Sequence, residues 1–529
     1  MRRRTIGLSL RLRCVLLTGV VLLSVAACAG RSQDGAAIRP IPNGLLHCFV
    51  PERECFIRYH PADFSAPIAY VPIPEHPTMA SNDGNNMHND AYMSDVYEAS
   101  GPLGLNPQIL SRTQGFGGYG TVASASTGQL VAVHSNARTF QLELMDPVTL
   151  EELASYDLPP RPWYFLLQGV MPWEYIGAGM YFYLDDQDRA VVPTTLNTVQ
   201  VVQAPTSQGG AFELVREYDL SDAVAPMRWP KQDSVAWVLP EWSGERYWFA
   251  TTQGVVGVIE VDSGTVRTLR LEGEIIENSF AVGEEGVFII SDRALYRFSR
   301  NEEGDIRVDW RTEYDPGSRK KPGVITRGSG ASVTLIGGLD GFVAVTDNAE
   351  PRIHLLFVRR DDGSVTCSVP LFEEGRSATD ITVIGLEHAD AQGRSAGVYS
   401  AIVENNWGRN IFPFARPAGG VARVDLSRQE GGPPLCEVVW DSNEKNIGVF
   451  KLSAGNGLLY LYYKADSFPI SKWYLTAVDF ATGDTVYRAL TGTGLGYNNW
   501  AASIFLHPDG GLAYSTTIFG LVAIQDAAP

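Results

Sequence analysis

Residues 277–315 read ENSFAVGEEGVFIISDRALYRFSRNEEGDIRVDWRTEYD, and this stretch decides the fold. It holds four runs rich in β-branched and aromatic residues, ENSFAV, GVFIISD, ALYRFS and IRVDWRTEYD, with turn residues between them. Gly, Asn and Asp favour tight turns because they accept positive φ angles or hydrogen-bond the local backbone. The stretch therefore predicts four consecutive antiparallel strands joined by short hairpins.

The same four-strand unit recurs along the chain, whereas a 3.6-residue apolar period with helix caps is nearly absent. Repeats of four strands at spacings of roughly 45 to 65 residues are typical of a β-propeller, in which each unit forms one blade of a ring. Together with the unit at Glu277, seven full units can be placed, the others beginning at Thr121, Gly179, Ser234, Ser332, Ile381 and Phe450.

The tail from Ser503 supplies only three strands, SIFLH, GLAYST and GLVAIQ. An open last blade would leave a bare sheet edge. We therefore expect the missing outer strand to come from the N-terminal side, between Asp90 and Gln114, with QILSRT at 108–113 as the candidate. The prediction is an all-β chain, a single propeller with eight blades closed by an N-terminal strand. Seven blades are the alternative count.

The first 27 residues have the anatomy of a secretory signal. Five arginines precede an apolar run from Cys14 to Ala27, which is too short to span a bilayer. The run ends Val-Ala-Ala-Cys and resembles the bacterial lipobox, which implies cleavage before Cys28 and acylation of its thiol, as with palmitate. An ordinary cleavage site with Cys28 incidental is the alternative. We expect a signal peptide (1–27), a flexible tether (28–43), an N-terminal extension (44–89) and the propeller (90–529).

The chain has 60 acidic and 42 basic residues and a formal net charge of −18. Such a charge argues against nucleic acid as a partner. From the signal and the lipobox-like cysteine, the expected location is the cell envelope, outside the cytoplasm and tethered to the membrane by lipid. Four cysteines remain after Cys14 and Cys28, and an even number in an exported chain favours disulfides. Cys48 and Cys55 could staple a hairpin. Cys367 and Cys436 lie in outermost strands of neighbouring blades, where they could pair or stay as two thiols.

A recurring phrase marks the turn between the third and fourth strands of several units. It reads VDSGTVRTL at 261–269, RDDGSVTCS at 360–368 and AVDFATGDTVYRAL at 477–490. In the last of these, Asp479, Thr482, Gly483 and Tyr487 resemble the blade hairpin of quinoprotein (PQQ)-like propellers, with Tyr where that family usually has Trp. The resemblance implies the fold. The alcohol-oxidising quinoproteins carry adjacent cysteines, which this chain lacks, so PQQ is not the expected cofactor.

In a propeller, the start of the first strand and the end of the second strand of each blade lie on one face of the ring, near the axis. Those positions carry Asn, Asp and Glu from blades far apart in sequence. Hard oxygen ligands of this kind suit Ca²⁺, and the set resembles the axial calcium site of gluconolactonase-like and paraoxonase-like propellers. Turn capping is the competing interpretation. The candidates are Asn278, Asp292, Asp347, Asn348, Asp380, Glu404, Asn405, Asn406, Asn498 and Asn499.

Two further segments hold candidate side chains. A loop predicted on the same face is basic and could bind an anionic group, or could be solvated, with the residues Arg319, Lys320, Lys321 and Arg327. The segment NDGNNMHNDAYMSD at 82–95 is dense in possible ligands but departs from the EF-hand spacing. It is interpreted as a plain loop in preference to an ordered cap on the ring.

No complete catalytic set can be assembled from these residues. The expected function is therefore a membrane-anchored exported propeller that binds a small molecule or a protein on one face. A Ca²⁺-dependent lactonase-like hydrolase is the alternative, and a quinone-dependent oxidoreductase is the distant one. Calcium analysis of the purified protein would separate the first two.

Overall fold

The computed structural model describes residues 39–40, 51–115, 117–136, 138–161, 179–207, 209–224, 233–409, 417–465, 471–499 and 501–527. The chain divides into two units, 1–37 and 38–529, and all of the described residues belong to the second. Cys48, the predicted partner of Cys55, and Cys28, the predicted site of acylation, lie outside the described residues. Among the described residues, no helix is long and apolar enough to cross a bilayer.

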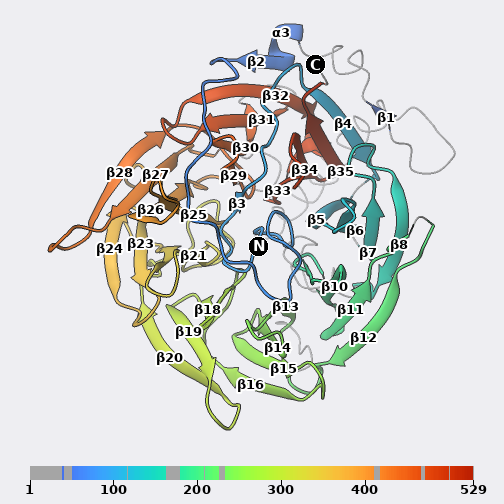
Figure 1. The fold of residues 1–529 in the computed structure, drawn as a ribbon, viewed down its shortest axis with the longest axis vertical. Coiled ribbons are helices and arrows are strands. Elements are labelled where there is room, and N and C mark those ends of the chain that lie inside the picture. Colours follow the sequence, from blue (N-terminus) through green and yellow to red (C-terminus); the bar gives the residue numbers. More distant parts are fainter. Residues whose placement is uncertain are drawn as a thin grey trace, which may run out of the picture. The chain divides into compact units, whose positions relative to one another are not determined.

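Eight sheets stand in a ring, and each forms one blade (Figure 1). This confirms the predicted count of eight. Six blades have four consecutive strands, in the order β5-β6-β7-β8 and so on around the ring. The first three of these are β5 (Gly117–Ser124), β6 (Leu130–Asn136), β7 (Phe140–Met145) and β8 (Glu152–Leu158); β9 (Tyr183–Leu184), β10 (Arg189–Pro193), β11 (Thr198–Gln203) and β12 (Glu213–Asp219); β13 (Val235–Pro240), β14 (Arg246–Thr251), β15 (Val255–Glu260) and β16 (Val266–Arg270).

The next three blades contain the stretch that predicted the fold and the two repeats after it. Within residues 277–315, the innermost strand is shorter than its sequence pattern suggested. The strands of the three blades are β17 (Ala281–Gly283), β18 (Gly286–Ile290), β19 (Ala294–Arg300) and β20 (Ile306–Glu313); β21 (Thr334–Ile336), β22 (Phe342–Thr346), β23 (His354–Arg359) and β24 (Val365–Pro370); β25 (Val383–Ala389), β26 (Ser395–Glu404), β27 (Val421–Ser427) and β28 (Leu435–Ser442).

The last two blades recruit strands from the N-terminal region. One has β29 (Lys451–Ser453), β30 (Leu458–Ala465), β31 (Lys472–Asp479) and β32 (Thr485–Thr493), with β2 (Phe56–Arg58) added outside and β3 (Val96–Tyr97) inside. The other has β33 (Ile504–Leu506), β34 (Leu512–Thr517) and β35 (Gly520–Gln525), then β4 (Gln108–Thr113) and β1 (Arg39–Pro40). Because β4 is the sequence QILSRT, the predicted closing strand is confirmed.

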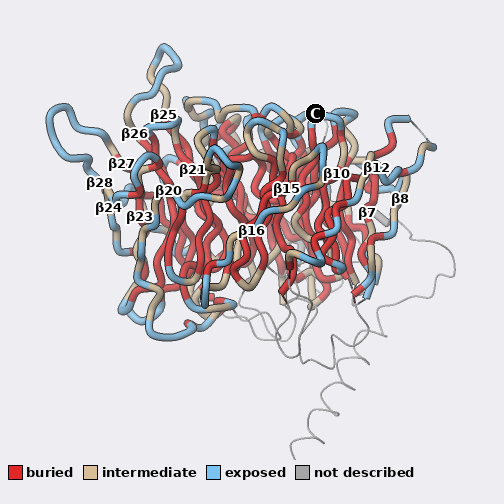
Figure 2. The backbone as a smooth tube through the Cα atoms, turned by 90° about the horizontal axis from the view of Figure 1, so that it is seen from below, coloured by how far each residue is buried: buried red, intermediate tan, exposed pale blue. Residues whose placement is uncertain are grey.

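Burial follows the position of each strand in its blade (Figure 2). The inner three strands are almost wholly buried, whereas outermost strands are mostly exposed or half-buried, as in β28. The apolar runs that predicted these strands thus reflect packing of blade against blade. The only helices among the described residues are α3 (Glu52–Cys55) and the 3₁₀ turn η2 (Leu495–Tyr497).

The predicted pairing of Cys367 and Cys436 forms a disulfide with a Cα–Cα distance of 6.4 Å. Cys367 lies in β24 and Cys436 in β28, the outermost strands of adjacent blades. The distance is within the range that a disulfide requires, so of the two alternatives for these cysteines the pair is the one found. Both strands carry a register shift in their pairing with the strand before them, and such bulges increase local twist.

Candidate functional site

The centre of the ring is filled by residues 83–97, which we call the channel segment. Every residue of this segment is buried, and Figure 1 shows the N-terminal trace winding through the middle of the blades. The interpretation of 82–95 as a plain loop was therefore wrong. The segment reads as polar in sequence, but most of its polar side chains hydrogen-bond inside the channel rather than with solvent.

The channel segment is held by hydrogen bonds from the innermost strands. The inner edge of each blade presents backbone N–H groups that would cost free energy if buried without a partner. Carbonyl groups of the segment accept hydrogen bonds from six of the eight blades. The pairs are Ser124 to Gly84, Leu184 to Asn85, Val282 to Ala91, Leu335 to Tyr92, Gly385 to Ser94 and Leu452 to Asp95, over 2.8 to 3.1 Å.

Side chains in the channel segment are also paired. Asp95 accepts a hydrogen bond from Thr382 at 2.5 Å, contacts His88 Nδ1 at 3.0 Å, and forms an ion pair with Lys451, which is itself fully buried. Burial alone would raise the pKa of Asp95, but Lys451 and His88 outweigh it and the pKa lies below its ordinary value. Asp83, Asn89, Met93 and Asp95 have positive φ, a conformation that Asn and Asp adopt more readily than most residues.

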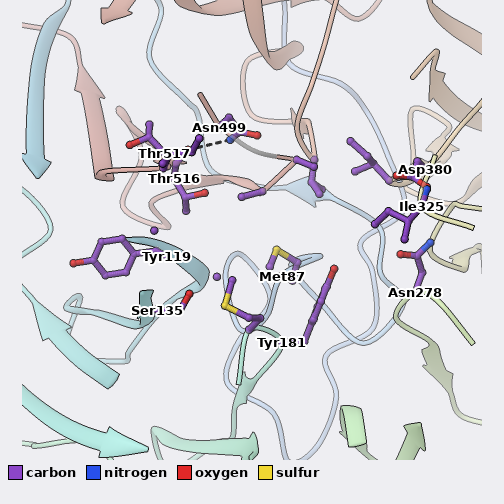
Figure 3. A pocket seen from close by; sticks show the side chains of 18 of the residues that line it. Met87, Tyr119, Ser135, Tyr181, Asn278, Ile325, Asp380, Asn499, Thr516 and Thr517 are labelled. Atoms are coloured by element: carbon purple, nitrogen blue, oxygen red, sulfur yellow. Dashed lines mark hydrogen bonds between the residues drawn. The ribbon is translucent and has the colours of Figure 1, made fainter. Parts of the chain in front are cut away.

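A cavity of about 180 Å³ lies against this segment, at the face where first strands begin and second strands end (Figure 3). Met87 and His88 of the channel segment are part of its lining. Its other walls come from β5, from the ends of β6 and β34, and from segments that precede β9, β17, β21, β25, β29 and β33 or follow β8 and β26. The apolar part includes Met180, Tyr181, Ile325, Ile381, Val449 and Ile518.

Three of the candidate residues, Asn278, Asp380 and Asn499, line this cavity. Both oxygens of Asp380 are already engaged. One accepts the N–H of Ile325 at 2.8 Å, and the other pairs with Arg409, which also lines the cavity. Burial raises the pKa of Asp380 to about 6, although Arg409 opposes the shift. Asn499 donates to Ser515 and Thr516, while its Oδ1 has no partner among the described residues.

The other candidates serve the local backbone. Asp347 accepts the N–H of His354 at 2.6 Å, Asp292 accepts that of Ile275, and Asn406 accepts that of Asp380. Asn348 and Asn405 donate hydrogen bonds to loop carbonyls. Glu404 accepts a hydrogen bond from the side chain of Asn446, and Asn498 directly follows η2. Within the described part of the chain, no three His, Cys, Asp or Glu side chains are grouped as a metal site would require. The calcium site remains a prediction.

The predicted basic loop at 319–327 packs beside the cavity. Lys321 is buried and donates to the carbonyl of Ala349 at 2.6 Å, and Arg319 pairs with Glu350 at 3.1 Å. Lys320 and Arg327 are exposed. The loop contributes Ile325 to the cavity, and it is this apolar residue, rather than the basic ones, that reaches the lining.

Sequence reasoning missed Glu277, Tyr181 and Arg409, all of which line the cavity. Glu277 directly precedes Asn278, so its place at the start of a first strand could have been inferred. Tyr181 lies two residues after Gly179, the predicted start of a unit, so its place near the axis could also have been inferred. Arg409 gave no such signal, because it lies in the connection between β26 and β27.

Glu404, behind the cavity wall, gives a pH-dependent stability. Its side chain is 1% exposed, and burial raises its pKa to about 7 from an ordinary 4.5, with Arg409 and Asp380 the nearby charges. Between these values the folded protein holds a proton that the unfolded chain releases, so stability falls as pH rises. From pH 5 to pH 7 this group should lower the unfolding free energy by about 2 kcal/mol.

Urea unfolding of the wild type and Glu404→Gln at the two pH values measures the effect. The amide cannot titrate, so the variant should show about 2 kcal/mol less decline with pH. Glu245→Gln, at an exposed position, is the control and should behave as the wild type. An identical decline in the wild type and Glu404→Gln would contradict the assignment.

No protein-family model matches the chain. An uncharacterized protein of Archaeoglobus fulgidus is 25% identical over 315 residues, which cover 53% of this chain and 58% of that protein. The chain thus spans under two thirds of that relative. Similar solved structures include BamB from Moraxella catarrhalis, with 12% identity over 82% of this chain and 97% of that chain and a TM-score of 0.42. Sqt1 from Saccharomyces cerevisiae has 10% identity over 65% of this chain and 94% of that chain, with a TM-score of 0.37.

Proposed function

We propose that the protein is an exported, lipid-anchored β-propeller that binds a small molecule in the cavity above the channel segment. The observation that carries this proposal is the cavity itself. Met87 and His88 of the channel segment form part of its lining, which is more apolar than polar and has acidic, basic and amide side chains at the walls. Concave, largely apolar sites with few oriented polar groups are typical of ligand pockets.

Blocking the cavity tests this function. Ile325 is 37% exposed, so a tryptophan there should fit the fold while its indole enters the opening. In a thermal-shift screen of small organic fragments, we expect ligands that stabilise the wild type and not Ile325→Trp. Leu339→Trp, at an exposed residue outside the lining, is the matched control and should keep every hit. If all hits persist in Ile325→Trp, the cavity is not the ligand site.

Export to an oxidising compartment is supported by the Cys367–Cys436 disulfide, since such bonds are rare in the cytosol. Anchoring is proposed at Cys28, by the likeness of Val-Ala-Ala-Cys to a lipobox. Cys28→Ser should move the protein from the membrane fraction to the soluble fraction in its native host. A variant that stays in the membrane fraction would remove the lipid anchor from the proposal.

A further inference from the structure

The wall of the cavity carries two carboxyl groups, Glu277 and Asp380, whose side chains hydrogen-bond to each other. Glu277 precedes β17; its Oε2 accepts a hydrogen bond from Thr326, while its buried Oε1 accepts none from the N–H and O–H groups of the described residues. Asp380, nearby, is different, because Arg409 and the N–H of Ile325 occupy both of its oxygens. Arg409 is therefore already committed to Asp380.

The electrostatics of Glu277 follow from this arrangement. Burial, and then the charge of Asp380, raise the pKa of Glu277 well above its ordinary value, against the smaller effects of Lys320 and Arg409. Lys320 is exposed and its charge is screened by solvent. A cation brought into the cavity would meet a carboxyl group that becomes ionised more easily in its presence.

A second unpartnered acceptor lines the same cavity. Asn499 is 1% exposed, and its Nδ2 donates to Ser515 Oγ at 3.0 Å and to the carbonyl of Thr516 at 3.2 Å. This pairing fixes the orientation of the amide and leaves Oδ1 without a donor. Buried acceptors without a hydrogen-bond donor favour a ligand that supplies one. An ammonium group offers three donors and no acceptor.

The rest of the lining defines the body of such a ligand. The cavity volume of about 180 Å³ exceeds the roughly 150 Å³ that admits benzene in an apolar protein cavity. Met87, Tyr181 and Ile325 face the same space in Figure 3. Burial raises the pKa of Tyr181 to about 12, and the charges of Asp380 and Glu277 contribute to this increase. The Tyr181 side chain therefore lies near the two acids. An aromatic ring there also favours a cation.

We infer that the cavity takes an organic cation about the size of one ring, a primary amine on a compact apolar body, with its ammonium group at Glu277. This inference rests on the proposed function, since it names the class of ligand for the same cavity. An anion would meet the Asp380 carboxylate, since the two guanidinium groups of the lining are already engaged, Arg409 with Asp380 and Arg161 with the carbonyl of Asn136. A neutral ring would leave Asn499 Oδ1 without a donor.

Three probes of one shape and different charge test the inference: benzylamine, benzyl alcohol and benzoate, by isothermal titration calorimetry. Benzylamine should bind the wild type about 10- to 100-fold more tightly than benzyl alcohol, the range expected for a hydrogen bond to a charged group. Benzoate should bind most weakly. Glu277→Gln should remove the preference for benzylamine, whereas Glu404→Gln, which does not line the cavity, should keep it.

Proton release gives a second measurement on the same samples. A bound cation lowers the raised pKa of Glu277, so at neutral pH benzylamine should displace a proton and its affinity should increase with pH. Titrations in two buffers of different ionisation enthalpy measure this proton, and Glu277→Gln should release none. The variant is nearly isosteric, and its circular dichroism checks that it folds.

The outcomes separate the two proposals. If benzyl alcohol or benzoate binds as tightly as benzylamine, and Ile325→Trp abolishes that binding, the ligand class is wrong but the binding site stands. If no probe binds the wild type, or if Ile325→Trp leaves binding unchanged, both the ligand class and the binding site are overturned.

Discussion

Replacing Lys451 with methionine is expected to lower the unfolding free energy by about 3–5 kcal/mol, the usual cost of removing one partner from a buried ion pair. Lys451 begins β29, and its ammonium group pairs with Asp95 and donates to the carbonyl of Met87 at 2.6 Å. Lysine and aspartate are both fully buried. Methionine fills similar space but leaves the Asp95 carboxylate without its main counter-charge.

Chemical denaturation followed by tryptophan fluorescence measures the loss. Arg394→Met, at a pair with Asp390 in which the arginine is 75% exposed, is the control and should cost less than about 1 kcal/mol. Adding Asp95→Asn to Lys451→Met should recover part of the loss, because the uncompensated charge disappears. A loss below 1 kcal/mol in Lys451→Met would mean that this pair does not hold the channel segment in place.

The second large effect is expected from the disulfide. It closes a loop of 69 residues between two blades, and the chain-entropy relation gives about 4 kcal/mol of stabilisation for a loop of that length. Cys367→Ala with Cys436→Ala should lose about that much, because the unfolded chain regains the freedom that the crosslink removes. The thiols are half-buried in an apolar setting, so alanine leaves no polar group unpaired.

A reductant provides the matched control in the disulfide experiment. Dithiothreitol should destabilise the wild type to the level of the double alanine variant and should leave the variant unchanged. Non-reducing peptide mass spectrometry establishes the linkage in the starting material. If the wild type is equally stable before and after complete reduction of the disulfide, the predicted contribution is refuted.

The blades could be predicted because each repeats one local pattern. Alternating apolar runs and Gly-, Asn- or Asp-containing turns placed the strands, and the missing fourth strand of the last unit pointed to QILSRT in β4. The channel segment could not be recognised in the same way. Its conformation depends on hydrogen bonds between its carbonyl groups and the innermost strands of six blades. A local pattern of apolar residues does not indicate such long-range contacts.

The candidate site was predicted by position more successfully than by chemistry. Strand direction placed Asn278, Asp380 and Asn499 on one face, and all three line the cavity. The same rule also selected Asp347 and Asn405, whose side chains cap local backbone groups instead. Residue type cannot separate these cases, because Asn and Asp serve equally as caps and as ligands.

The channel segment has a consequence for how the chain acquires its fold. It is synthesised before any complete blade, yet its partners arrive one after another, and Asp95 meets Lys451 only 356 positions later. The closing strand β4 must likewise wait for β35, near the far end of the chain. The chain entropy lost in closing such long loops precedes the stabilising contacts, and this makes folding slow. The channel segment and β4 therefore lack some of their partners until β29 and β35 have been synthesised.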